Sequence, residues 1–135
     1  MIDNVYTILS NNASVSSAAT GGIWLEEVPQ GKEPAYIALS IVDGDTNDSK
    51  TSTSKMDVYI ISVSVYAQRL YDSGGVVGAV SLLELVRNAL DGYEDTVNGQ
   101  LMYCRAFSTP QTFNLSIPNK KLISAEMDYE IYATR

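Results

Sequence analysis

Residues 56–68 read Met-Asp-Val-Tyr-Ile-Ile-Ser-Val-Ser-Val-Tyr-Ala-Gln, and this stretch determines the expected fold. Nearly all of its side chains are β-branched, aromatic or small, a composition that favours a pleated strand. Alternate side chains of a strand lie on opposite faces. One face is wholly apolar and consists of Tyr59, Ile61, Val63, Val65 and Ala67. The other face is apolar only at its first end, so the pattern predicts a long central strand with a helix packed on the more apolar side.

The following segment, Val76–Gly92, predicts one long helix. Its apolar residues recur at helical spacing and form a wide stripe, which consists of Val76, Ala79, Val80, Leu82, Leu83, Val86, Ala89 and Leu90. Asp72 or Ser73 can cap the first turn, and Gly92 can adopt the left-handed conformation after the last turn. Three glycines lie in or before the first turns: Gly74, Gly75 and Gly78. Each weakens a helix by up to about 1 kcal/mol relative to alanine, which indicates either a close approach of helix and sheet or a frayed helix start.

The rest of the chain adds a short N-terminal helix, Ile2–Ser10, and a further helical turn near residues 15–19. Shorter strands are predicted at Ile23–Val28, Ala35–Val42, Leu101–Phe107 and Lys121–Thr134. Tyr93–Gly99 reads as a polar turn that ends in the hairpin dipeptide Asn98-Gly99. Ser108–Pro118 reads as irregular, with an alternating run that could form a short edge segment.

Length and element order together predict the fold class. A chain of 135 residues is expected to form a single domain, residues 1–135. We expect an α+β domain with a mostly antiparallel (mixed) β-sheet, one long helix packed on a face and a short N-terminal helix.

The charge balance argues against a protein that grips nucleic acid. Sixteen acidic and nine basic side chains give a formal charge of −7, whereas phosphate contacts need clustered Lys and Arg. The balance is compatible with a surface that DNA slides past. The chain has no histidine, so it lacks the commonest general base and the commonest transition-metal ligand. An enzyme is therefore not expected.

Cys104 is the single cysteine, so an internal disulfide is excluded. Its apolar neighbours favour a buried strand thiol over a reactive one. No apolar run approaches the roughly 20 residues of a membrane span, and no charged-then-apolar leader is present. We expect a soluble protein made in the cytosol, with no membrane partner.

No motif supports catalysis, a cofactor or a metal. The loop Asp43–Ser54 superficially resembles a calcium loop, but its sixth residue is Asp48 rather than glycine and its twelfth is Ser54 rather than glutamate. The glycines before the helix lack the spacing and the lysine of a phosphate loop, and no GxSxG elbow is present. We therefore predict no catalytic, cofactor-binding or metal-binding residues.

Two polar features remain. Glu126, Asp128 and Glu130 form a carboxylate row on one face of the last strand. This face is either solvated or lines something that is itself negatively charged. The polar segment Asp43–Ser54 is either a flexible solvated linker or a segment that orders on a partner. The candidate contact residues in and beside this loop are Asp43, Asp45, Asn47, Asp48, Lys50, Thr51 and Lys55.

The order of these elements resembles the tail-completion or tail-terminator proteins of long-tailed bacteriophages, which are also described as head–tail joining proteins. The resemblance covers nearly the whole chain. It rests on the N-terminal helix, the run Gly22-Ile23-Trp24-Leu25, the strand start Pro34-Ala35-Tyr36, the polar loop, the central strand and the helix end Ala89-Leu90-Asp91-Gly92. Ala35 between Pro34 and Tyr36 departs slightly from the family's Pro-Tyr-like strand start.

The resemblance implies a structural virion protein of the tail or neck, assembled in the host cytoplasm. It implies a homo-oligomeric ring, typically a hexamer, that caps the head-proximal end of the tail tube and stops tube polymerisation. The implied partners are other copies of the chain, the tail tube protein and the head connector or head-completion protein. Genomic DNA would pass through the lumen without specific binding. The row Glu126, Asp128 and Glu130 would face this lumen, and the loop at residues 43–55 would be a contact arm.

Three alternatives come from other classes. A tail tube subunit or another neck protein of the same virion would share a plan of sheet and helix. A small enzyme that uses Asp and Glu would need a carboxylate in a pocket. A ligand-binding module would need a pocket lined by polar groups.

Overall fold

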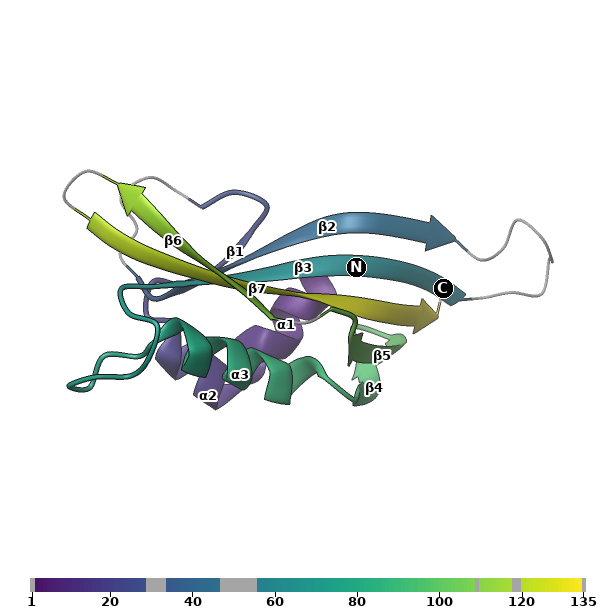
Figure 1. Cartoon of the computed structure of the whole chain (residues 1–135). Coiled ribbons are helices and arrows are strands. Elements are labelled where there is room, and N and C mark those ends of the chain that lie inside the picture. The colour runs from purple at the N-terminus through teal and green to yellow at the C-terminus, as the bar shows by residue number, and fades with distance from the viewer. Residues whose placement is uncertain (1, 29–33, 47–55, 109, 118–119, 135) are drawn as a thin grey trace.

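A computed structural model describes residues 2–28, 34–46, 56–108, 110–117 and 120–134, and gives the backbone alone for 43–46, 56, 112–117, 120 and 121. The elements are, in chain order, α1 (Ile2–Asn11), α2 (Ala13–Ala18), β1 (Ile23–Leu25), β2 (Tyr36–Thr46), β3 (Met56–Ala67), α3 (Ala79–Leu90), β4 (Tyr93–Val97), β5 (Gln100–Ala106), β6 (Gln111–Ile117) and β7 (Lys120–Thr134). The strands form one curved sheet, and the three helices lie together against one of its faces (Figure 1).

The sheet has the strand order β1-β2-β3-β7-β5-β4, and β6 pairs with β7 as well. β1 is parallel to β2, whereas the other strand pairs of the described residues are antiparallel, so the sheet is mixed. β5 and β6 lie end to end along the same edge of β7. β5 pairs with Tyr129–Ala133, and β6 pairs with Lys120–Glu126. β7 is therefore bonded to β3 on one side and to two consecutive strands on the other.

The core lies between the sheet and the helices. Alternate residues of β3 and β7 are buried there: Ile61, Val63, Val65, Ala67, Ile123, Ala125, Met127, Tyr129, Ile131 and Ala133. The helices contribute Val5, Ile8, Leu9, Leu82, Val86 and Leu90. The period of two in the strands and the period of 3.6 in the helices bring these apolar faces together. Burial of this surface is the dominant favourable contribution to folding.

Asn4 of α1 is a buried polar residue at the border of this apolar interior. Asn4 donates a hydrogen bond to Gln100 at 2.6 Å and accepts one from Asn98 at 2.8 Å. Gln100 donates in turn to the carbonyl of Thr134 at 2.7 Å. The network joins the first turn of α1 to the β4–β5 turn and to the end of β7.

The expected fold class is wrong, because no long helix packs on a face of the sheet in the part of the chain that the structure describes. The longest helix, α3, has only 12 residues, and it shares that face with α1 of 10 residues and α2 of six. The molecule is mostly a mixed β-sheet with three short helices. The predicted apolar stripe began too early because Val76 lies in a tight turn rather than in the helix.

The glycines explain this shorter helix. Gly74 and Gly75 adopt φ values of +57° and +82°, and the turn that they form is bonded between Ser73 and Val76. Two consecutive left-handed residues are typical of a tight hairpin turn and are incompatible with a helix. At Gly78, an added Cβ would lie 2.6 Å from the Cα of Tyr71. The close approach is therefore between the helix start and its preceding loop, not between the helix and the sheet.

The strand predictions succeed where one face is apolar. The central strand and the last strand are confirmed as β3 and β7, with the expected faces buried. β2 extends to Thr46, into the segment expected to be a loop. Tyr93–Val97 forms β4 rather than a polar turn, while Asn98-Gly99 forms the predicted hairpin turn between β4 and β5. The expected irregular segment contains β6.

Candidate functional site

The carboxylates of Glu126, Asp128 and Glu130 lie on the face of β7 that points away from the helices. The residues between them, Met127 and Tyr129, are buried in the core. All three acidic residues are half-buried because β3 and the strands on the other edge of β7 flank them. The structure thus brings the predicted row together on one sheet face.

The carboxylates of Glu126 and Asp128 make few contacts with neighbouring side chains. Glu126 accepts a hydrogen bond of 3.4 Å from the hydroxyl of Ser64, its partner on β3. The backbone of Asp128 bonds to the segment between β5 and β6, since its carbonyl accepts from Phe107 at 2.8 Å and its amide donates to Ser108 at 3.0 Å. Within the described residues neither carboxylate forms an ion pair. Both therefore present their negative charge to the surface.

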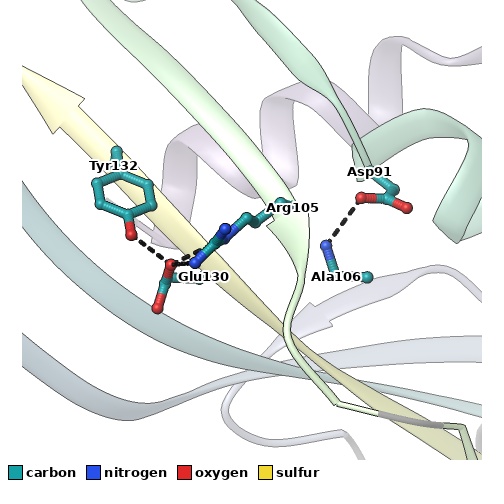
Figure 2. Close-up of polar contacts among 5 residues, drawn as sticks. All are labelled: Asp91, Arg105, Ala106, Glu130 and Tyr132. Atoms are coloured by element: carbon teal, nitrogen blue, oxygen red, sulfur yellow. Dashed lines mark hydrogen bonds and ion pairs between the residues drawn. The ribbon is translucent and has the colours of Figure 1, made fainter.

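Glu130 is different, because Arg105 and Tyr132 surround its carboxylate (Figure 2). The Arg105 guanidinium lies 2.7 Å from Glu130 and also donates through Nε at 3.0 Å. The Tyr132 hydroxyl donates to the same oxygen of Glu130. Hydrogen bonding from Tyr132, and then from Arg105, holds the pKa of the Glu130 carboxyl below its usual value. The charge of Glu130 is thus largely compensated, and the row is not uniform.

The outer face of β5 lies beside this group. Leu101, Tyr103 and Arg105 of β5 share a face with Phe107, which directly follows the strand, and all four are exposed. The Tyr103 ring lies 6.1 Å from the Tyr132 ring, and the Arg105 guanidinium lies 6.0 Å from the centre of the same Tyr132 ring. This part of the outer face is aromatic and apolar, whereas the β3–β7 part carries serines and carboxylates.

The end of α3 fixes the position of β5 under this surface. Asp91 follows the helix and accepts a hydrogen bond from the amide of Ala106 at 2.9 Å (Figure 2). Arg87, one turn earlier, lies 3.6 Å from the Asp91 carboxylate. The next residue, Gly92, donates its amide to the carbonyl of Cys104 at 2.8 Å. The Asp91-Gly92 pair therefore connects helix and sheet.

Asp43 and Asp45, two of the predicted contact residues, lie within β2. They pair with Ile60 and Val58 of β3. Asn47, Asp48, Lys50, Thr51 and Lys55 lie outside the described residues. The first four residues of the expected loop, 43–46, thus belong to β2, and the rest of it lies outside the described residues.

The residues that the structure describes hold no group of three or more His, Cys, Asp or Glu side chains arranged to bind a metal. The Cys104 thiol is fully buried, and burial raises its pKa to about 12, which confirms the predicted strand thiol. None of the helices described has the length and apolarity required to span a membrane.

An open hollow of about 530 Å³, which no sequence pattern predicts, lies between α1, α3 and β4. Its polar lining consists mainly of amides and hydroxyls, among them Asn11, Asn88, Asn98 and Thr7. Among the described residues, no carboxylate, Lys, Arg or Cys lines it. The hollow therefore offers hydrogen bonds but no carboxylate for acid–base chemistry.

A curved mixed sheet with helices on one face also occurs in solved structures of other proteins. A solved chain described as "Virion of native gene transfer agent (GTA) particle" has the same fold, with a TM-score of 0.64 at 14% identity, covering 97% of this chain and 92% of that chain. A second solved protein, whose name gives no function, matches with a TM-score of 0.50 at 10% identity over 97% of this chain and 95% of its own. The sequence model of the family "Tail completion protein gp17" matches residues 3–134, and the chain belongs to this family. No curated protein matches the chain.

Family membership confirms the resemblance predicted from the sequence. The protein is a structural protein of a phage tail or neck, it is located in the virion, and it assembles there with other tail or head proteins. The family description names a step in tail assembly and no reaction, which favours a structural role over an enzyme.

Proposed function

We propose that the protein forms a closed homo-oligomeric ring, a hexamer, at the head-proximal end of the tail tube. The ring ends tube polymerisation and presents a surface to the head connector or head-completion protein. The observation that carries this proposal is the match to the tail-completion family over residues 3–134. Ring contacts are head-to-tail, so each subunit needs two different and complementary surfaces.

In this proposal DNA passes through the lumen of the ring, and the outer face of β7 lines that lumen. A net charge of −7 supports a surface that repels phosphates rather than binding them. Glu126 and Asp128 would contribute most of this repulsion, because Arg105 compensates Glu130. Their field extends over roughly the 8–10 Å of a Debye length.

The segment that follows β2 is proposed as a contact arm toward the tail tube protein or a neighbouring subunit. It contains Asn47, Asp48, Lys50, Thr51 and Lys55, and Asp43 and Asp45 lie in the strand that leads to it. A segment with this polar composition adds little to a core and suits ordering on a partner.

The ring is tested by the mass of the purified protein in light scattering, alone and with tail tube subunits. We expect a discrete closed oligomer, or a monomer that becomes one on tube ends, and tubes of limited length in its presence. A monomer that neither binds tube ends nor limits their growth would contradict the proposal.

The lumen face is tested by the pair of substitutions Glu126→Gln and Asp128→Asn. Loss of two charges per subunit weakens the repulsion of DNA, so we expect slower DNA ejection from particles that assemble normally. The matched control is Glu84→Gln with Asp95→Asn, which removes the same charge from exposed positions on α3 and β4. Equal ejection rates for the two variants would exclude β7 from the lumen.

A further inference from the structure

Large apolar side chains that stay exposed are concentrated at two places on opposite sides of the sheet. The first place, the β2 edge patch, consists of Leu25, Ile41 and Val42, which are 37%, 43% and 57% exposed. The second, the β5 patch, consists of Leu101, Tyr103 and Phe107, which are 46%, 39% and 53% exposed. In the strand order, β1 and β2 lie on one side of the β3–β7 pair and β5 lies on the other. Exposed apolar side chains gathered in this way indicate interaction surfaces.

The β2 edge patch is exposed because β2 extends beyond the end of its neighbour β1. β1 pairs with β2 only from Ile37 to Leu39, so within the described residues the outer edge of β2 has no strand partner beyond that point. A bulge between Ile41 and Asp43 leaves Val42 without a partner on β3. Such bulges redirect a side chain and interrupt the ladder. An exposed apolar side chain thus lies in a stretch of β2 that a second molecule can reach.

The β5 patch is a face rather than an edge. β4 and β7 pair with β5 on its two sides, so its backbone bonds are used within the chain. The exposed side chains alternate along the strand, and the exposed Arg105 lies among them. This patch can therefore bind a partner through side chains and not by strand addition.

We infer that the β2 edge patch of one subunit packs on the β5 patch of the next subunit. This inference rests on the proposed ring, which requires two different patches at opposite sides of the same chain. Charge supports a second copy as the partner. Exposed Glu26 and Glu27 follow Leu25 at the β2 edge, whereas Arg105 lies within the β5 patch and, although it pairs with Glu130, keeps its side chain 52% exposed. Apolar contact with opposite charges beside it is the composition of a specific interface.

The test uses Val42→Asp and Phe107→Asp, each of which places a carboxylate in the apolar contact. We expect each variant to weaken ring formation at least about tenfold, because a carboxylate would be moved from water into an apolar contact. The matched control is Tyr71→Asp, since Tyr71 is 67% exposed but lies in the loop before α3, outside both patches. This control is expected to form rings like the wild type, and circular dichroism verifies that all three variants are folded.

Mixing the two variants gives the sharper result. The Val42→Asp variant keeps an intact β5 patch, and the Phe107→Asp variant keeps an intact β2 edge patch. One contact can form between them and no further subunit can add, so native mass spectrometry is expected to show a one-to-one heterodimer and nothing larger. Homodimers of either variant alone would show that each patch pairs with itself and would overturn the inference.

The remaining outcomes separate this interface from the ring itself. If both variants form rings as readily as the wild type, the inferred interface is wrong and the proposed function still stands. A wild-type protein that forms no closed oligomer, alone or with tail tubes, would overturn both.

Discussion

The two faces of β7 differ in what each position can tolerate. On the inner face, Tyr129 and Ile131 are fully buried beneath the helices. On the outer face, Asp128 and Glu130 alternate with them and stay half-exposed. The inner residues are determined by packing, because interiors are close-packed and a lost side chain leaves a cavity. The outer residues are not needed for the core, so their charge can change without leaving a cavity.

The largest effect is expected when this comparison is tested from the inside. Ile131→Ala removes a fully buried side chain between Tyr59 of β3 and Cys104 of β5. We expect the free energy of unfolding to fall by about 2–5 kcal/mol. The outer pair Glu126→Gln with Asp128→Asn is expected to change it by no more than about 0.5 kcal/mol. Chemical denaturation measures both changes in the free energy of unfolding. Comparable losses would contradict the conclusion that only the inner face of β7 is determined by packing.

The smallest effect sharpens the comparison within the outer face. The pKa of Glu130 is lowered in the folded protein, so its interactions stabilise the fold above the ordinary carboxyl pKa, which is 4.5. That contribution is lost as the pH falls through the lowered value. We therefore expect the wild type to exceed Glu130→Gln in stability near neutral pH, by less than the cost of Ile131→Ala.

This difference is expected to disappear in acid, as Glu130 becomes protonated. Denaturation curves at several pH values between about 7 and 3 measure it. Asp128→Asn is the matched control, since Asp128 has no ion pair within the described residues. A wild-type advantage that stays constant down to the lowest pH would assign the stability to the shape of the side chain rather than to its charge.

The sequence predicts those elements whose two faces differ strongly. β3 and β7 follow from their alternation, and the burial of Cys104 follows from its apolar neighbours. β4 could not be recognised, because Glu94, Asp95 and Thr96 are all exposed and leave no alternation to detect. A short edge strand of this kind is held by its hairpin partner rather than by its own pattern.

The helix error has a similar origin. Apolar spacing continued back to Val76, but Gly74 and Gly75 impose a tight turn, and turn geometry overrides periodicity. With the stripe shortened, α3 is one of three helices that divide the inner face. The family resemblance depended on element order and was unaffected by these lengths.

The candidate site was predictable in part. The row of three carboxylates follows from the period of a strand. The pairing of Glu130 with Arg105 does not, because it depends on the register between β7 and β5, which are separated in the chain by β6. The exposed pair at Ile41 and Val42 was also missed, since only the structure shows that β1 stops at Leu25.

The pairing of β7 has a mechanical consequence. One edge of β7 is bonded to β3, and the other is shared by β6 and β5. Antiparallel hydrogen bonds run perpendicular to the strands. A pull along β7 therefore loads two ladders at once, in shear, instead of opening bonds one after another. The strand that carries the acidic row is thereby built to resist lengthwise force, while β4, bonded on one side to β5, would peel away far more easily.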